Sequence, residues 1–348
     1  MFDIELIKSL SEMQGVSGYE HNVAEHVSQL YGVYCDDVYT DSLGNVIGIK
    51  KSMFENAPKL MIEAHMDEIG LMITDIDDRG FLYFTSVGGI DARILLANEV
   101  VVHGKRDVYG IIGAKPPHVL NADERKKTVP MDKLYIDTGY SAQHIKEIVE
   151  PGDTVTFKNK FVQLKNNIIS TKSQDDRTSV AVLVSVMKKL QNYQPPFDIY
   201  FVASVQEEVG LRGAKTAAYG INPDMAIVID VCHATTPDSG SGDAYDFGSG
   251  AIVTKGPNIH PKMLSTVLKA LDENGIGYQI DIEGGDTGTD AWAVQVCRCG
   301  IPTVLFSVPL RYMHTPVETV SCSDLSTLVN SISAFVTHVS DAEECICY

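Results

Sequence analysis

The chain has 348 residues, of which 44% are hydrophobic and 21% charged, and its formal net charge is −18 at pH 7. The length predicts two domains, and the composition is that of a water-soluble globular protein with a large core. The strongly acidic balance repels phosphate backbones and argues against nucleic acid as a partner. We find neither a secretory signal nor an apolar run long enough to cross a membrane, so we expect a cytoplasmic location.

The seven cysteines do not form a metal-binding or disulfide pattern. Their number is odd and no Cys-x-x-Cys pair occurs. This usage favours a reducing compartment over a disulfide-stabilised secreted fold. Cys345 and Cys347 lie near the C-terminus, and the sequence leaves open whether they pack or react.

The first part of the chain predicts two helices, a hairpin and a buried strand. Apolar residues at helical spacing indicate helices over 3–13 and 20–31. The turn Asp41–Gly44 separates two strand-like runs, which predicts a hairpin. The apolar run Leu60–Ala64 then leads to His65.

The next part, residues 69–162, predicts a small β-rich domain. Turns at Asp77–Gly80 and Gly104–Asp107 separate short strands, and further strands are expected at 134–137 and 154–157. A short helix is expected over 141–149. The polar segment 118–131 is expected to be an exposed loop, with contact to a partner as the alternative.

From about Asn167 the chain alternates between strands and helices. Such alternation predicts a mostly parallel sheet covered by helices on both faces. We therefore expect one α/β domain from residues 1–68 and 163–348, into which residues 69–162 are inserted. The expected strands are 198–205, 225–230, 278–282 and 303–308, and the expected helices are 176–190, 261–273, 291–296 and 323–339.

Acidic residues and histidines follow the buried strands at several places. His65 and Asp67 are two apart on a strand, so they point to the same side, and a carboxylate commonly holds the second nitrogen of a metal-binding histidine. Taken alone, His65 could equally be a structural histidine. Asp230 ends the strand 225–230, where either a helix cap or a metal ligand is expected.

Three further positions repeat this pattern. Asp175 and Asp176 begin a helix, where they could be simple N-terminal caps. Glu207 and Glu208 directly follow the strand 198–205, and His314 follows the strand 303–308. At the carboxyl ends of parallel strands such side chains share one edge of the sheet.

The combined donor set favours two metal ions over one. It comprises two imidazoles and three carboxylates, which is too many for one tetrahedral catalytic zinc. The set suits two metals that share a carboxylate and a water, with a spare glutamate as general base. The candidate ligands are His65, Asp175, Glu208, Asp230 and His314.

The chain resembles the M42 family of metallo-aminopeptidases, which includes glutamyl and tetrahedral aminopeptidases. The matching stretches fall in order over nearly the whole chain. They are Ala64–Gly70, Lys115–Leu120, Asp175–Arg177, Val205–Ala214, Gly288–Ala291 and Pro309–Glu318.

The resemblance implies a zinc-exopeptidase-like fold with an inserted lid and a dinuclear active site. His65, Asp175 and Asp230 would hold one metal, and Asp175, Glu208 and His314 the other. Glu207 would act as general base on the metal-bridging water, and Asp67 would orient His65. The family pattern also implies a cis bond after Asp175, two divalent ions (zinc or cobalt), peptide substrates, and a homo-oligomer that can be a dodecamer.

Thr178 and Ser179 depart from the family pattern, in which Val or Phe and then Gly are common, and we expect only a small packing change.

Three rival functions remain. A related dinuclear carboxypeptidase or deacylase would use similar ligands, although the run from Gln206 to Gly213 favours an aminopeptidase. A glycosidase of the cellulase type needs two carboxylates and would leave both histidines idle. A non-catalytic metal-binding scaffold would not need Glu207. Arg311 is a candidate for recognition of acidic substrates, but the sequence does not settle the preferred residue.

Overall fold

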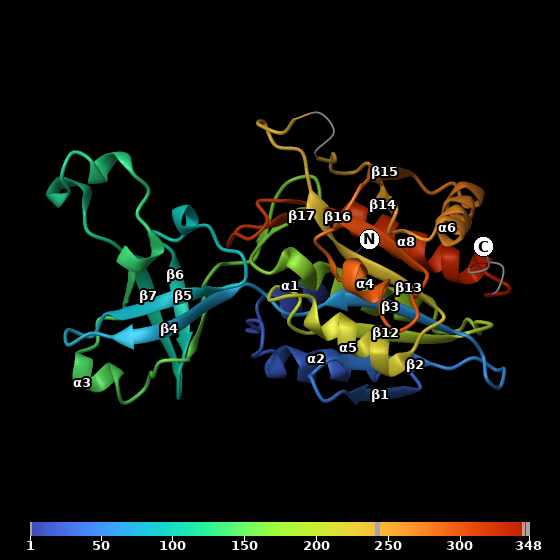
Figure 1. The fold of residues 1–348 in the computed structure, drawn as a ribbon, viewed down its shortest axis with the longest axis horizontal. Helices are drawn as coiled ribbons and strands as arrows, with labels where there is room; N and C mark the ends of the chain where they lie inside the picture. Colours follow the sequence, from blue (N-terminus) through green and yellow to red (C-terminus); the bar gives the residue numbers. More distant parts are fainter. Residues whose placement is uncertain (1, 241–243, 343–344, 346–348) are drawn as a thin grey trace.

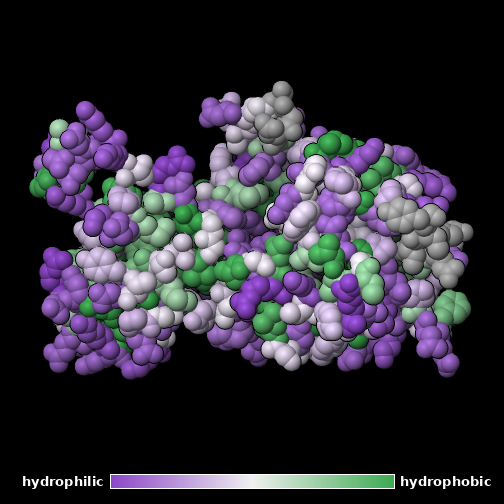
Figure 2. Space-filling model, in the orientation of Figure 1, coloured by the Kyte–Doolittle hydropathy of each residue, from purple (hydrophilic) through white to green (hydrophobic). Residues whose placement is uncertain are grey.

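The computed structural model describes residues 2–240, 244–342 and 345. The chain forms a larger α/β body and a smaller closed β-barrel, which lie side by side (Figure 1). Of the described residues, hydrophilic ones cover most of the face in view, as the net charge of −18 requires (Figure 2). None of the helices in the described ranges combines the length and hydrophobicity needed to span a bilayer.

The α/β body is built on an 11-stranded sheet. Its main order is β1-β2-β12-β3-β13-β16-β17-β11-β10, and β14 pairs with both β16 and β15. The strands are β1 (Asp37–Thr40), β2 (Val46–Lys50), β3 (Lys59–His65), β10 (Val162–Gln163), β11 (Ile168–Ser170), β12 (Asp198–Ser204), β13 (Met225–His233), β14 (Ala251–Lys255), β15 (Tyr278–Ile282), β16 (Thr303–Arg311) and β17 (Thr319–Ser321).

The expectation of a mostly parallel sheet is correct only for its centre. Strands β12, β3, β13 and β16 are parallel neighbours, whereas β1, β2, β10, β11 and β17 pair antiparallel. β14 runs antiparallel to β16 and parallel to β15. The outer strands reverse because short turns join them, as between β1 and β2, whereas helices connect the central strands. The parallel centre brings His65 level with Ser204, and Asp230 level with Ser307.

Helices cover both faces of the sheet. Successive right-handed crossovers place α4 and α5 on opposite faces, because β12 and β13 lie on opposite sides of β3. The helix α8 packs against α4 and α6, and α7 packs against α5. The bounds are α1 (Ile4–Ser11), α2 (His21–Tyr31), α4 (Gln174–Lys189), α5 (Arg212–Ile221), α6 (Pro261–Glu273), α7 (Asp290–Val294) and α8 (Cys322–His338).

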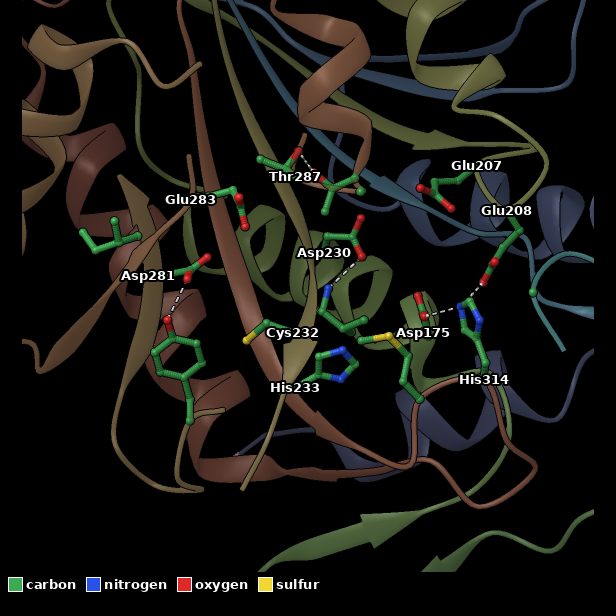
Figure 3. A pocket seen from close by; sticks show the side chains of 17 residues that line it. Asp175, Glu207, Glu208, Asp230, Cys232, His233, Asp281, Glu283, Thr287 and His314 are labelled. Carbon is green, nitrogen blue, oxygen red and sulfur yellow. Dashed lines mark hydrogen bonds and ion pairs between the residues drawn. The ribbon is translucent and has the colours of Figure 1, made fainter. Parts of the chain in front are cut away.

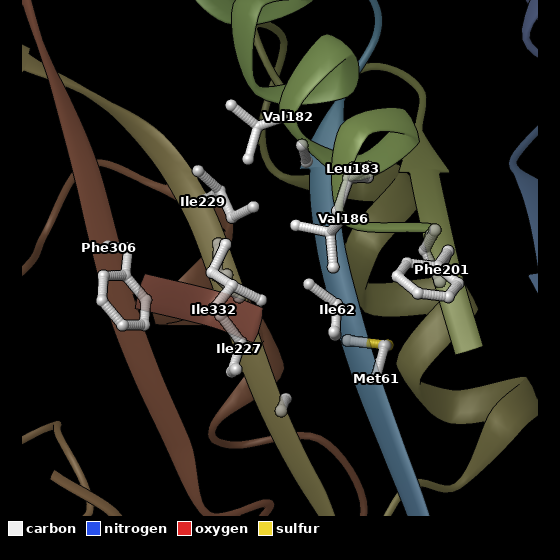
Figure 4. Packing of buried hydrophobic residues seen from close by; sticks show 14 of the residues in the cluster. Met61, Ile62, Val182, Leu183, Val186, Phe201, Ile227, Ile229, Phe306 and Ile332 are labelled. Carbon is white, nitrogen blue, oxygen red and sulfur yellow. The ribbon is translucent and has the colours of Figure 1, made fainter. Parts of the chain in front are cut away.

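The main core lies between α4, α8 and the central strands. Ile62 on β3 faces Val186 on α4, and Ile229 on β13 lies below Val182 (Figure 4). All four side chains are almost completely buried. Burial of each such side chain contributes on the order of 1.5–3 kcal/mol to folding, so this layer holds the central strands in register.

The barrel has its own apolar core. Its strands close in the order β4-β5-β8-β7-β6-β9. Alternate residues such as Val100 and Val102 point inward, as the period of two in a strand requires. The bounds are β4 (Gly70–Ile76), β5 (Leu82–Val87), β6 (Glu99–His103), β7 (Asp107–Gly113), β8 (Tyr135–Asp137), β9 (Thr154–Phe157) and the short helix α3 (Ala142–Ile145).

The sequence analysis did not predict five elements of the α/β body, and it overestimated the length of one helix in the barrel. The strands β10, β11, β14 and β17 have only two to five residues. The helix α5 buries Ala214, Ala217, Ala218 and Ile221 at helical spacing, a signal that the sequence analysis did not use. The helix expected over 141–149 is only the four-residue α3. Cys345 is buried, and Cys347 lies outside the described residues.

The loop between α1 and α2 packs against the segment that follows β12. Glu20 is 6% exposed. Its carboxylate accepts hydrogen bonds from the backbone N–H of Gly18 at 2.6 Å and of Gln206 at 3.1 Å. Burial raises the pKa of Glu20 to about 7, even though these two hydrogen bonds favour the ionised form.

This shift predicts a pH-dependent stability difference between the wild type and Glu20→Gln. Between about pH 4.5 and 7 the folded chain keeps a proton on Glu20 that the unfolded chain has released. The stability that Glu20 contributes is therefore lost as the pH rises through this window. Glutamine keeps the acceptor oxygen without the charge. We expect the variant to be more stable by about 1–3 kcal/mol at pH 8, with little difference at pH 4.5.

Urea unfolding of the metal-free chain at several pH values measures this difference. The exposed Glu25→Gln on α2 is the matched control, and its stability should follow that of the wild type. A Glu20→Gln effect that does not change with pH would contradict the assignment.

Candidate metal centre and active site

The carboxyl ends of the central strands bring the expected metal ligands and the expected general base together. His65 ends β3, Glu207 and Glu208 follow β12, and Asp230 lies on β13. Asp175 at the start of α4 and His314 after β16 complete the cluster. Three overlapping groups have ligand atoms within 4.8 Å of one another: His65, Asp175 and Asp230; Asp175, Glu208 and His314; His65, Glu207 and Glu208.

Asp175 lies between the two histidines. Its Oδ1 is 3.1 Å from His65 Nε2, and its Oδ2 is 3.4 Å from His314 Nε2. The same His314 nitrogen lies 3.3 Å from Glu208 Oε1 (Figure 3). One carboxylate therefore faces two imidazoles with its two oxygens, which is the arrangement expected of a ligand shared by two ions. The peptide bond from Asp175 to Asp176 is cis.

Asp67 contacts both sides of the cluster. Its Oδ1 lies 3.4 Å from His65 Nδ1 and accepts a hydrogen bond from the Glu207 N–H at 3.0 Å. Its Oδ2 accepts hydrogen bonds from Ser17 Oγ at 2.5 Å and the Glu208 N–H at 3.2 Å. Asp67 thus fixes the backbone of both glutamates in addition to its expected place beside His65.

Sequence reasoning missed Glu318, which holds two of the candidate ligands. It is 1% exposed, and its carboxylate accepts the N–H of Asp175 at 3.1 Å and of His314 at 2.8 Å. Its position four residues after His314, inside a matching stretch, was the available signal. The role of Ser17 had no such signal, because its contact with Asp67 spans 50 residues.

Glu68 belongs to a separate buried network. Its carboxylate accepts hydrogen bonds from the Gly15 N–H at 3.0 Å, Lys172 Nζ at 2.7 Å and Ser173 Oγ. These bonds join the first loop to the segment before α4. Thr178 and Ser179, which depart from the family pattern, are fully buried within α4.

The cluster holds more buried negative charge than its own side chains can neutralise. The pKa of Glu207 is raised to about 10, chiefly by burial; His65 opposes this rise, whereas Asp230 and Asp290 add to it. Burial also raises the pKa of Asp230. For His314 burial alone would lower the pKa, but Asp175 and Glu208 outweigh it and raise the value to about 11.

These residues fit divalent metal ions. Imidazole nitrogens and carboxylate oxygens are the donors that zinc and cobalt take. Within the described part of the chain, His65 only partly offsets the burial that raises the pKa of Asp230 and Glu207. A cation at the cluster would favour the ionised carboxylates and the neutral imidazoles.

The cluster forms one wall of a cavity of about 760 Å³. The barrel reaches this cavity through Gly89, where an added Cβ would lie 3.0 Å from His314 Nδ1. The side chains and backbone that line it are Gly89, Asp175, Glu207, Glu208, Asp230, Val231, Cys232, His233, Tyr245, Asp281, Ile282, Glu283, Thr287, Gly288, Thr289, Met313 and His314.

Arg311, the candidate for recognition of acidic substrates, does not line the cavity. Its Nε donates a hydrogen bond to the Thr235 carbonyl at 2.7 Å, and its guanidinium lies 4.2 Å from the centre of the Phe247 ring. Its Nε and the face of its guanidinium thus hold the loop that follows β13.

Comparison with known proteins identifies relatives over the whole chain. The family model of M42 glutamyl aminopeptidases matches residues 44–330. A lysyl aminopeptidase of Pyrococcus furiosus is 34% identical, and the alignment covers 97% of each chain.

Two solved structures show the same fold. The tetrahedral (TET) aminopeptidase of a marine sediment thaumarchaeote is 32% identical with a TM-score of 0.93, covering 98% of this chain and 97% of that one. The TET1 peptidase of Pyrococcus horikoshii is 35% identical with a TM-score of 0.84, covering 96% and 98%. That peptidase can assemble into a tetrahedron or a large octahedral shell. The chain therefore belongs to the M42 family of aminopeptidases, and it is a peptide hydrolase.

Proposed function

We propose that the chain removes N-terminal residues from peptides with two divalent metal ions, zinc or cobalt, bound per subunit. The observation that supports this most directly is the place of Asp175 between His65 and His314. The first ion would be held by His65, Asp175 and Asp230, and the second by Asp175, Glu208 and His314. When bound, such ions polarise a scissile carbonyl and lower the pKa of water.

Glu207 is the proposed general base. It lines the cavity beside the ligands, and its backbone is fixed by Asp67. A carboxylate in this place can take a proton from the attacking water and deliver it to the leaving amine. Asp67 orients His65 and the Glu207–Glu208 segment, and its own contacts with His65 and Ser17 keep its pKa below the usual value although burial opposes this.

The rival activities differ from this proposal in their chemistry. A carboxypeptidase or deacylase would use the same ions on a different substrate end, so the choice rests on family membership. A glycosidase requires two carboxylates that flank the sugar and no metal. Here Asp175 and Glu208 both approach His314, which a glycosidase would not need.

Residues 69–162 are proposed to form a lid that also takes part in assembly. The barrel strands have their own core, and Gly89 reaches the cavity. We propose that the chain forms a homo-oligomer, possible sizes including the dodecamer of the family. Size-exclusion chromatography with light scattering measures this size directly. The cytoplasmic location stays a prediction.

Glu207→Gln should abolish turnover without removing the metals. Glutamine cannot accept the proton, and loss of a general base lowers rates by about 10²–10⁴-fold. The kcat on an aminoacyl chromogenic substrate, with metal content from elemental analysis, checks this outcome. Glu25→Gln serves as control, since Glu25 is exposed on α2. Unchanged turnover in Glu207→Gln would remove the residue from this role.

Metal titration tests the dinuclear centre apart from activity. The chelated chain should bind two zinc or cobalt ions per subunit, and an ion at 100 times its Kd should stabilise the fold by about 2.7 kcal/mol. EDTA should abolish aminopeptidase activity, which a metal-free glycosidase would retain. His65→Ala and His314→Ala should each weaken one site, whereas His118→Ala, on an exposed loop, should bind both ions. A single ion per wild-type subunit would refute the proposal.

A further inference from the structure

The cavity has a second acidic wall that the metal centre does not use. Asp281 on β15 and Glu283 directly after it are two apart and both line the cavity. Figure 3 shows them on one side of Asp230, with Glu208 and His314 on the other. Asp230 is 5% exposed and lies between the two ends. A bound molecule can therefore contact the metal centre and this wall together.

The structure holds the Asp281 carboxylate in a fixed place. Tyr245 Oη donates a hydrogen bond to Asp281 Oδ1 at 2.7 Å, and Thr254 Oγ1 donates to Oδ2 at 3.3 Å. Tyr245 is in turn held by backbone hydrogen bonds with His233 and Thr235 at the end of β13, each of 2.9 Å. A carboxylate fixed by neutral donors retains lone pairs for another partner.

No positive side chain balances this wall. Across the described part of the chain, neither lysine nor arginine lines the cavity. Of its six carboxylates, Asp175, Glu207, Glu208 and Asp230 belong to the proposed metal centre, whose ions would offset their charge. Asp281 and Glu283 have no such compensation, and Arg311 is bound to the Thr235 carbonyl instead.

We propose that Asp281 and Glu283 select substrates whose N-terminal side chain is basic, lysine or arginine. The inference rests on the proposed aminopeptidase function and adds the substrate class to it. A cationic side chain that extends from the metal centre would gain charge-assisted hydrogen bonds at this wall. A glutamyl or aspartyl side chain would meet two uncompensated negative charges there. If a substrate bound in the opposite orientation, Asp281 and Glu283 would attract its α-ammonium group instead of its side chain.

Paired substrates separate charge from size. Lysyl and norleucyl p-nitroanilides share an unbranched side chain of the same number of carbons, and only lysine carries the terminal ammonium. We expect kcat/KM for the lysyl substrate to exceed that for the norleucyl substrate by about tenfold, since one charged hydrogen bond is worth roughly that factor. The glutamyl substrate should be the poorest, and added salt should narrow the difference.

The double variant Asp281→Asn, Glu283→Gln tests which residues cause the preference. It should reduce the lysyl-to-norleucyl ratio of kcat/KM to near one. Asp286→Asn is the matched control, because Asp286 is exposed, lies outside the cavity lining and accepts the Gly288 N–H through an oxygen that asparagine keeps. That control should retain the wild-type ratio.

The outcomes distinguish the two levels of the proposal. Hydrolysis of norleucyl and lysyl substrates at equal rates by the wild type would overturn the specificity and leave the aminopeptidase proposal intact. An equal loss on all substrates in the double variant would assign the wall to the α-ammonium group and overturn side-chain selection. No hydrolysis of any aminoacyl substrate by the metal-loaded wild type would overturn both.

Discussion

The geometry of the centre depends on the buried carboxylate of Asp67. This side chain is fully buried and receives hydrogen bonds from Ser17 and from the backbone of Glu207 and Glu208, while it faces His65. It therefore joins the loop after α1, the end of β3 and the segment after β12. Movement of any one of these segments would displace side chains on the other two, so a small number of bonds fixes the relative places of base and ligands.

A second constraint is the accumulation of negative charge. Asp175 lies close to both Glu208 and Asp230 in a region with little solvent, and Glu318 adds a further buried carboxyl that contacts the Asp175 N–H. Such an arrangement costs folding free energy unless cations or protons neutralise it. Much of this charge gathers where the parallel centre of the sheet exposes strand ends, although Glu63 inside β3 is also fully buried beside Asp290. Aliphatic side chains fill much of the remaining core beside the sheet (Figure 4).

Much of this arrangement could be predicted from local sequence, because a buried strand marks where the next polar residue lies. His65 and Asp230 follow or end apolar runs, and Glu207 stands just beyond one. The antiparallel β1–β2 hairpin was expected, but the other antiparallel strands were not, since strands of two to five residues such as β14 give little periodic signal. Asp281 was not foreseen either. Alternation along β15 tells which face a side chain occupies, but its partner Tyr245 comes from a loop 36 residues away.

Long-range contacts were the hardest to infer. Ser17 donates a hydrogen bond to Asp67, 50 positions away, and no spacing rule connects the two. Glu318 accepts the N–H of Asp175, 143 positions away, and only its closeness to His314 gave a local signal. Arg311 illustrates the opposite error. Its residue type suited an acidic substrate, but the neighbouring Thr235 carbonyl and Phe247 ring take its guanidinium out of the cavity.

The spread of the candidate ligands along the chain has a consequence for synthesis on the ribosome. They run from His65 to His314, so nine-tenths of the polypeptide must emerge before the last imidazole is available. A nascent chain that ends before β16 already contains the candidate carboxylate ligands, but it lacks the strand that positions His314. Capture of metal at full strength is therefore a late event, which follows translation of the C-terminal segment and docking of β16 beside β13.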